Sequence, residues 1–399
     1  MRILLVAQNF YPEDFKSNDI AFELPKYGHE VDVLTGIPNY PEGKFYKGYN
    51  WFKRKKEKVA GVNVKRVLIL PRGKSKVGLA INYLSFCFFA SIRAFFIGLL
   101  NRYDCVIVHQ TSPVIQAYPG IVVKKMQNIP LYMWVLDIWP DSMISGSGIH
   151  DKRIIAAVDH LVKNIYRQCN KILISSMGFA ELIASKDINA DRLIYFPNWS
   201  DDVLNMPKIK IPDLPSGFII MMAGNLGGAQ RLESVMKVVM EIRDYEEVKW
   251  ILVGDGSKKN VVEEFIKEHH LENTVYAVGR FPFEAMPSFY SAADAMLLSL
   301  KAEFAHLRAV IPARLISYLS AARPVLAMAD GAVAELIRES DCGFAVPADD
   351  YKGLAEIIKS QVLTNKKSFE MKGANGRAYF EKYFTKESCV SHLNDIISQ

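Results

Sequence analysis

Three glycines fall within five residues after an apolar run in the segment AGNLGGAQRLESV (223–235). Glycine lets an anion approach the backbone, and the amides of such a turn attract phosphate when a helix begins behind them. Gly224, Asn225, Gly227 and Gln230 are therefore candidates for binding the phosphates of a ligand. The segment is neither a Walker A motif nor GxGxxG. An ordinary turn between a strand and a helix explains the same residues.

Further residues of suitable chemistry follow at later strand ends. Gly254, in GDGS, repeats the glycine turn, although such turns are often structural only. Arg280 leaves a third apolar run, and Phe281 either contacts a base or packs in the core. Arg314 begins a helix, where it is either a surface cation or a group that stabilises the charge of a leaving diphosphate. Glu335 begins another helix, where it either caps amides or binds a ribose diol.

The first half of the chain carries its own polar strand ends. His109 ends one apolar run and is either a structural histidine or a group that orients a substrate hydroxyl or phosphate. Asp137 ends another and either accepts a proton from a hydroxyl or bonds loop amides. Asn39 and Tyr40 follow the second run and are candidates for the side of the site that holds this hydroxyl. The acids of the loop 9–19 are weaker candidates.

Continuous apolar runs that end in these residues predict parallel strands covered on both faces, and hence an α/β fold. Ligands of such sheets bind beyond the carboxyl ends of the strands. The proline-rich segment 201–217 reads as a linker. We therefore expect two Rossmann-like domains that face each other across a cleft. The runs are 2–8, 30–36, 63–70, 105–110, 131–137 and 171–176 before the linker, and 218–227, 248–256, 275–280, 295–300, 323–331 and 343–350 after it.

Composition is that of a globular protein: 399 residues, 50% hydrophobic and 23% charged. It excludes disordered, collagen-like and disulfide-rich small proteins. Five dispersed cysteines without a CxxC motif predict a reduced, cytosolic protein with no structural zinc. The start of the chain reads as a strand, not as a secretory signal. Residues 77–100 are long enough to cross a bilayer, but Arg93 within them favours a buried or interfacial helix.

The net charge of +6 is unevenly distributed. Residues 44–76 contain twelve Lys or Arg and one acid, a net charge of +11, whereas the remainder carries −5. Aromatic residues are interleaved with these cations, and the apolar stretch 77–100 follows directly. This combination predicts a patch that attaches the protein peripherally to an anionic membrane. No nucleic-acid motif accompanies the cations, so we do not expect a nucleic-acid partner.

The motifs occur in one order over nearly the whole chain and together resemble bacterial family-4 glycosyltransferases of the GT-B fold, in particular the WbuB-like branch. The resemblance rests on QNFYPED, YGHEVDVLTGIPNYPEGKFYKGY, VHQTSP, VLDIWPDS, GNLGGAQRLE, LVGDG, RFPFEAMPSFYSAAD, IPARLISYLSAARPVLA and CGFAVPADD. Members of that branch add N-acetyl-L-fucosamine or a related amino sugar to a lipid-linked intermediate of O-antigen or capsule synthesis.

The resemblance implies an acceptor-binding domain over residues 1–200, a nucleotide-sugar domain over 201–380 and a helix, 381–399, that returns to the first domain. It implies metal-independent transfer from a UDP-sugar to a polyprenyl-diphosphate-linked sugar on the inner face of the plasma membrane, with no cofactor. Catalysis would use His109, Asp137 and Arg314. The acceptor would contact Asn39, Tyr40 and Thr111, and the donor Gly224, Asn225, Gly227, Gln230, Gly254, Arg280, Phe281, Ser317 and Glu335.

Three features, at four positions, depart from the family pattern. Ala309 and Ser317 stand where many members carry a pair of glutamates, so that Glu303 is a possible replacement. Arg314 replaces a usual lysine, and Arg231 replaces a glycine. Two other functions therefore stay open: a UDP-sugar epimerase of the same fold, and a non-catalytic partner in a polysaccharide assembly complex.

Overall fold

The structure is a computed structural model that describes residues 1–73 and 75–399. Its contacts divide the chain into two compact units, Met1–Phe196 with Val390–Gln399, and Pro197–Cys389. The sequence predicted boundaries at 200/201 and 380/381, which lie four and nine residues from these positions. Lys74, one of the twelve cations of the basic segment, lies outside the described residues.

The first unit is built on an eight-stranded sheet in the order β3-β4-β2-β1-β5-β6-β7-β8. All neighbours are parallel except β3, which pairs antiparallel with β4. The central strands are buried along nearly their whole length, as their apolar sequences predict. The strands are β1 (Arg2–Val6), β2 (Glu30–Gly36), β3 (Lys56–Val59), β4 (Val62–Val67), β5 (Cys105–Gln110), β6 (Leu131–Val135), β7 (Lys171–Ile174) and β8 (Leu193–Tyr195).

Two edge strands, β3 and β8, were not predicted. β3 has the sequence KEKV, which lacks an apolar run, and it forms because Ala60 and Gly61 adopt positive φ angles of 47° and 86° in a tight turn to β4. β8 is three residues long and only half-buried. Charged or very short edge strands carry little apolar signal in the sequence.

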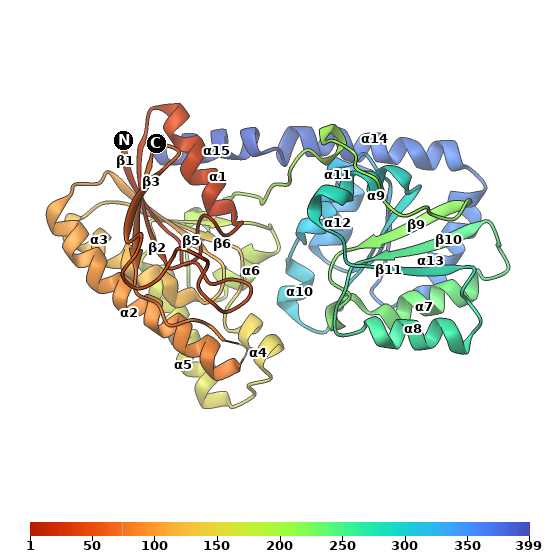
Figure 1. The fold of residues 1–399 in the computed structure, drawn as a ribbon, viewed down its shortest axis with the longest axis horizontal. Helices are drawn as coiled ribbons and strands as arrows, with labels where there is room; N and C mark the ends of the chain where they lie inside the picture. The colour runs from red at the N-terminus through yellow and green to blue at the C-terminus, as the bar shows by residue number, and fades with distance from the viewer. Residues whose placement is uncertain (74) are drawn as a thin grey trace. The chain divides into compact units, whose positions relative to one another are not determined.

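The longest helix of the first unit, α2, packs beside α3 and against β2 and β4 (Figure 1). Its inner face buries Phe86, Ala90, Ala94 and Ile97, which recur at helical spacing. Among the described residues α2 is the one helix long and apolar enough to cross a membrane. The helices are α1 (Lys16–Glu23), α2 (Lys76–Leu100), α3 (Tyr118–Gln127), α4 (Asp141–Ser147), α5 (Lys152–Gln168) and α6 (Phe179–Ala184).

The second unit has a six-stranded parallel sheet in the order β11-β10-β9-β12-β13-β14. Numbered within the unit, this is 3-2-1-4-5-6, the order of nucleotide-binding folds, in which ligands bind where the order reverses beside the first strand. Apolar clusters cover both faces of the sheet. The strands are β9 (Phe218–Ala223), β10 (Val248–Val253), β11 (Val275–Gly279), β12 (Ala295–Ser299), β13 (Val325–Met328) and β14 (Gly343–Val346). Together the sheets confirm the predicted α/β class and the two Rossmann-like units.

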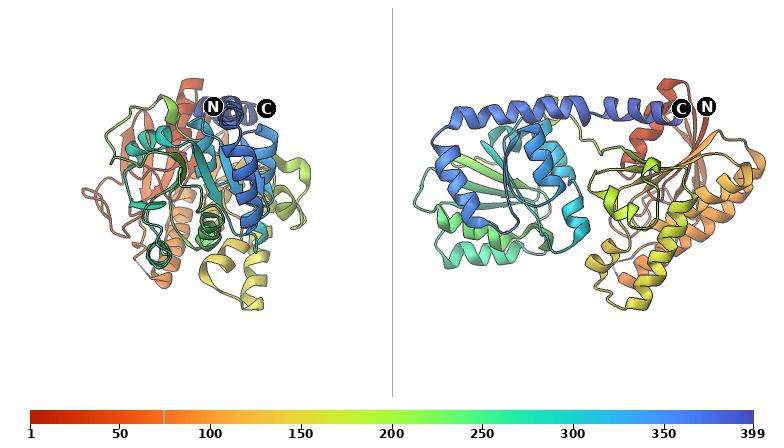
Figure 2. Two further views of the ribbon diagram at one scale, coloured as in Figure 1. Left: turned by 90° about the vertical axis from the view of Figure 1, so that its right-hand side faces the viewer. Right: turned by 180° about the vertical axis from the view of Figure 1, so that it is seen from behind.

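The helices that flank the second sheet can be followed in the two further views of Figure 2. They are α7 (Leu232–Glu241), α8 (Lys259–Glu268), α9 (Met286–Ala292), α10 (Ala305–Ala309), α11 (Ala313–Ser320), α12 (Ala332–Ser340), α13 (Tyr351–Ile357), a π-helical segment (Ile358–Leu363), α14 (Lys366–Tyr383) and α15 (Lys386–Ser398). The final residues of α15 join the first unit, where the Asn394 side chain lies 2.8 Å from His29 Nε2.

Candidate functional site

Two glycine turns meet at the carboxyl ends of β9 and β10. Gly224 and Gly254 adopt φ angles of 120° and 148°, which strongly favour glycine. A Cβ atom on Gly254 would lie 1.8 Å from the Gly224 carbonyl oxygen, so no larger residue fits there without moving the backbone. The turns are joined by a hydrogen bond from the Leu226 amide to the Asp255 carbonyl, 2.9 Å long. They therefore form one fixed backbone surface where the sheet order reverses.

The rest of the glycine-rich segment holds its own shape. Gln230 is buried, and its Oε1 accepts a hydrogen bond of 3.2 Å from the Gly227 amide. Its carbonyl oxygen is therefore committed to the loop and not free for a ligand. Asn225 is exposed, and its backbone carbonyl accepts from Arg314 Nη2 at 3.3 Å. The sequence predicted that Gly224, Asn225, Gly227 and Gln230 belong to one loop, and the structure places them in one loop. The sequence did not show that the Gln230 side chain points inward and the Asn225 side chain outward.

Arg314 lies directly against this loop. Its Cζ would be 3.4 Å from a Cβ on Gly224, and it lies in the first turn of α11. Its Nη1 is buried and has no hydrogen-bond partner within the described chain. A buried guanidinium nitrogen without a partner is costly, and an anion bound at the glycine turns would satisfy it. This orphan donor is the strongest sign of a ligand in the second unit.

A cavity of about 350 Å³ opens at this position. Its size is at the lower end of the range for small-molecule sites. Phe281 is half-buried and packs edge-on against Phe289, with ring centroids 4.8 Å apart, so that its other side is available to the cavity. The cavity brings together five of the predicted donor-binding residues, and its lining is Gly224, Asn225, Val253, Gly254, Asp255, Arg280, Phe281 and Met286.

Four predicted donor residues do not line this cavity: Gly227 and Gln230 of the loop described above, and Ser317 and Glu335. Ser317 lies one turn after Arg314, and its hydroxyl is 2.9 Å from that of Ser200. Glu335 is exposed in the first turn of α12. Glu303, considered as a replacement for a lost glutamate, is ion-paired with Arg231, which also lies 3.0 Å from Asp349. Arg231 thus forms ion pairs with two carboxylates, those of Glu303 and Asp349, at the start of α7.

Tyr318 is a functional residue that the sequence did not reveal. Its fully buried hydroxyl donates to the Ala223 carbonyl and accepts from the Ala223 amide, both at 3.1 Å. Burial raises the pKa of this phenol, while the nearby Arg314 lowers it. The side chain therefore fixes the end of β9 immediately before Gly224. Its only signal in the sequence is an apolar-face position on α11, which equally indicates core packing.

In the first unit, His109 is buried, with 2% of its surface exposed. Its ring centroid lies 5.2 Å from that of Trp134, and its Nε2 has no hydrogen-bond partner within the described residues. Burial lowers the pKa of His109 to about 3, so that the imidazole is neutral at ordinary pH. This position does not favour proton exchange with a substrate, and it fits the structural alternative.

Asn39 is also turned inward. Its Nδ2 donates to the Ile37 carbonyl, and its Oδ1 accepts from the Arg72 amide and from Asn82 Nδ2. Glu13, from the loop after β1, fixes the same turn, because its Oε1 accepts from the amides of Asn39 and Tyr40 at 2.6 Å each. Burial raises the pKa of Glu13, although these hydrogen bonds oppose the shift. Both residues shape the loop that presents Tyr40.

Asp137, Tyr40, Arg72 and Tyr83 form the more accessible polar group of the first unit. Burial raises the pKa of Tyr83, with Arg72 lowering it and Asp137 and Tyr40 raising it further, which places these charges within electrostatic reach of one phenol. Arg72 also lies over the Tyr40 ring, at 5.2 Å from its centroid. Asp137 is half-buried and accepts a hydrogen bond from Ser142. The sequence had singled out Asp137 and Tyr40 but neither Tyr83 nor Arg72.

Thr111 lies in the loop after β5, where its hydroxyl oxygen is 3.4 Å from Gln116 Nε2. Gln110 is fully buried and donates to the Asp137 carbonyl at 3.2 Å, so it ties the loops after β5 and β6 together. Over the described residues, no cluster of three or more His, Cys, Asp or Glu side chains is arranged to hold a metal ion.

Comparison with known proteins agrees with this geometry. Residues 208–379 match the family described as glycosyl transferases group 1. Over 99% of its length the chain is 25% identical to the whole of an Escherichia coli K12 protein named "Putative colanic acid biosynthesis glycosyl transferase WcaI". The N-acetyl-alpha-D-glucosaminyl L-malate synthase of Bacillus anthracis is 22% identical over 62% of the chain and 60% of its own length.

Solved structures share the architecture. Anabaena HepE in complex with UDP covers 100% of both chains with a TM-score of 0.71 and 15% identity, and the same protein has been solved with UDP-glucose. Sucrose-phosphate synthase from Thermosynechococcus elongatus aligns over 100% of this chain and 98% of its own, with a TM-score of 0.74 and 16% identity. At such identities the likeness establishes the fold.

Proposed function

We propose that this chain, which has the GT-B fold and matches the glycosyl transferases group 1 family over residues 208–379, transfers a sugar from a UDP-sugar to a polyprenyl-diphosphate-linked acceptor. The sugar would be N-acetyl-L-fucosamine or a related amino sugar, as in the WbuB-like branch. The product would be an intermediate of O-antigen or capsular polysaccharide. Support comes from the E. coli relative, whose name places it in colanic acid biosynthesis.

The donor would bind in the cavity of the second unit. The turns at Gly224 and Gly254 allow a diphosphate to approach backbone amides, and the unpartnered Nη1 of Arg314 supplies a charge-assisted hydrogen bond. Phe281 and Arg280 would contact the base. The orphan donor of Arg314 is the observation that carries the proposal, because it lies beside the glycine turns, where a bound anion would satisfy it.

The reaction breaks the bond between the anomeric carbon and the UDP oxygen. An acceptor hydroxyl forms the new bond to that carbon and loses its proton, for which Asp137 is the available carboxylate in the first unit. UDP leaves with an additional negative charge. Arg314 and the loop amides, which already face that position, stabilise the charge as it develops. No step requires His109 to exchange a proton.

The experiment is an assay of UDP release with a panel of UDP-sugars and polyprenyl-diphosphate-linked acceptors. We expect Arg314→Gln to lower kcat/KM about a hundredfold, since a fixed donor to developing charge is worth roughly that much. Arg338→Gln, which removes an exposed arginine from α12 of the same unit, is the matched control. No UDP release with any donor would contradict the proposal, and interconversion of UDP-sugars without acceptor would indicate an epimerase.

We also propose that the protein is cytoplasmic and attaches peripherally to the inner face of the plasma membrane through the first unit. The outer face of α2 exposes large apolar side chains along its whole length, and eight of the twelve cations of the basic segment are exposed. Lys65 and Arg66 are not available, because they pair with Asp32 and Glu57. The exposed apolar residues are Val77, Ile81, Leu84, Phe88, Ile92, Phe95, Phe96, Leu99 and Leu100.

A further inference from the structure

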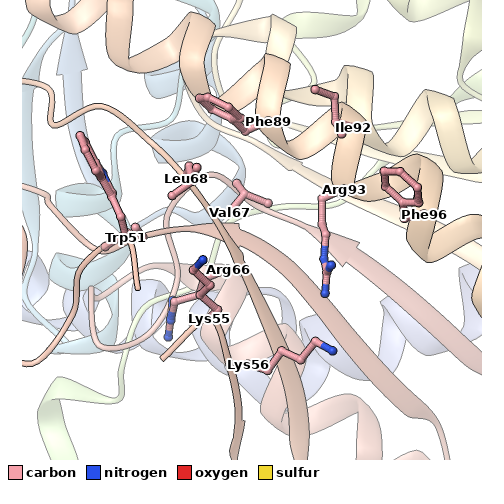
Figure 3. A pocket seen from close by; sticks show the side chains of 11 residues that line it. Trp51, Lys55, Lys56, Arg66, Val67, Leu68, Phe89, Ile92, Arg93 and Phe96 are labelled. Carbon is pink, nitrogen blue, oxygen red and sulfur yellow. The ribbon is translucent and has the colours of Figure 1, made fainter. Parts of the chain in front are cut away.

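A cavity of about 540 Å³ lies in the first unit between α2 and the edge of the sheet formed by β3 and β4 (Figure 3). Its lining contains four cations and no acid. The remaining lining residues are apolar, three of them aromatic. The arrangement is therefore a cationic hollow with apolar walls. It is separate from the donor-binding and acceptor-binding groups described above.

Three of the four cations have no ion pair with an acid within the described residues, and only Arg66 has one. Arg66 is fully engaged by Glu57, at 2.5 Å, and by the carbonyls of Gly36 and Tyr11. The Lys55 amine lies over the Phe52 ring, 5.5 Å from its centroid. By contrast, Lys56 and Arg93 form no side-chain hydrogen bond or ion pair within the described residues.

Figure 3 shows the Arg93 side chain extending from α2 toward the end of Lys56. Arg93 is half-buried and is the only charged residue among positions 77–100, a stretch otherwise apolar or neutral. Lys56 is exposed and Arg93 is half-buried, so the two cations repel one another and Arg93 also loses hydration. An anion between them removes both penalties, so the pair points to an anionic ligand.

An apolar groove of about 1020 Å³ lies on the other side of Ile92 and Phe96, between α2 and α3. Both residues line the cationic cavity as well as this groove. The groove is walled almost wholly by apolar side chains, including Leu84, Phe88 and Val122. A ligand that reaches both hollows must combine an anionic group with a hydrocarbon chain.

We infer that this paired site binds one anionic phospholipid, with its phosphate between Arg93 and Lys56 and an acyl chain crossing Ile92 and Phe96 into the groove. The inference rests on the proposed membrane attachment and adds a defined lipid site to it. Tyr83, near Asp137, lies ten residues before Arg93 on α2, about 15 Å along the helix axis. That separation favours a lipid of the bilayer over the diphosphate of the acceptor, whose sugar must reach Asp137.

The test uses the full-length protein without any UDP-sugar, so that its outcome does not depend on glycosyl transfer. Binding of dihexanoyl-phosphatidylglycerol, below the concentration at which it forms micelles, is followed by calorimetry. Dihexanoyl-phosphatidylcholine and glycerol phosphate are the comparison ligands, because they lack the net charge and the chains respectively. We expect saturable binding at one site and binding about tenfold weaker for either comparison ligand.

Arg93→Gln and Lys56→Gln should each weaken lipid binding about tenfold, whereas Lys58→Gln should change the affinity by less than about twofold. Lys58 is exposed on the same strand, β3, and does not line the cavity. Equal losses in Lys58→Gln and Arg93→Gln would overturn the inference in favour of diffuse surface charge. Thermal unfolding of each variant verifies folding, and Ile92→Ser tests the groove independently of charge.

Two further results would also overturn the inference. Binding of a short-chain polyprenyl diphosphate in place of the phospholipid would make the site an acceptor subsite. Absence of saturable binding in the wild type, with attachment to anionic vesicles preserved, would leave membrane attachment standing without a defined lipid site. Loss of vesicle attachment itself would contradict the proposed attachment, and UDP-sugar turnover measured separately would still test the glycosyltransferase proposal.

Discussion

His109 shows how burial determines what a single residue can do. The sequence places it at a strand end, where a histidine can contact substrate, but its ring packs on Trp134 in the core. Burial lowers its pKa to about 3, whereas an unfolded histidine titrates near 6.5. The unfolded chain therefore binds the proton first as pH falls. Stability from this residue is fully present above about pH 6.5 and decreases below it.

We expect the free energy of unfolding of the wild type to fall by about 2 kcal/mol between pH 7 and pH 5 through His109 alone. His109→Gln should lack this component, because glutamine does not titrate. Urea unfolding at the two pH values measures the difference between wild type and variant, in which the contributions of other groups cancel. Equal pH dependence in the two proteins would show that native His109 binds a proton as readily as it does in the unfolded chain.

At the scale of elements, the donor site depends on where three segments end. β9 and β10 stop at Gly224 and Gly254, and α11 begins beside them with Arg314 in its first turn. Tyr318 joins α11 to β9 through both backbone groups of Ala223. The strand ends could be predicted from apolar runs and glycines. The hydrogen bonds between Tyr318 and Ala223 could not, because they link residues 95 positions apart.

Tyr318→Phe should therefore lower stability by about 1–3 kcal/mol, since it leaves the buried amide and carbonyl of Ala223 without this partner. It should also raise the dissociation constant for UDP several-fold, because the Gly224 turn is less well fixed. Tyr290→Phe is the control, since Tyr290 packs against Tyr318 with centroids 5.7 Å apart. Thermal unfolding and UDP titration report the two effects. Unchanged UDP affinity in a destabilised Tyr318→Phe would reduce Tyr318 to a purely structural residue.

At the scale of the whole molecule, the two units carry surfaces suited to different classes of ligand. The second unit holds the anion-binding turns, and the first holds the exposed face of α2 with the basic segment beside it. An apolar helix face flanked by cations binds anionic bilayers through burial of apolar surface and through electrostatic attraction. Each cation near the surface adds about 1 kcal/mol to the binding free energy. The attraction weakens as salt screens the charges.

Replacement of Lys53, Arg54, Lys55 and Lys56 by glutamine should thus release most of the protein from vesicles that contain phosphatidylglycerol. The control replaces Lys208, Lys210, Lys267 and Lys352, four exposed lysines of the second unit. Flotation with vesicles at low and physiological salt measures the bound fraction. Equal release of both quadruple variants would indicate that net charge, and not this surface, governs attachment.

The sequence by itself determined the α/β class, the two sheets, most strand ends and the two glycine turns, one with Gly224 and Asn225 and the other with Gly254. These features follow from local signals, because apolar runs and glycines act over a few neighbouring residues. Only the tertiary structure decided which polar side chains turn inward, as Asn39, Gln230 and His109 do, and which cations form no ion pair within the described residues, as is true of Arg93. Those outcomes depend on burial and on partners from distant segments, and no local pattern encodes either.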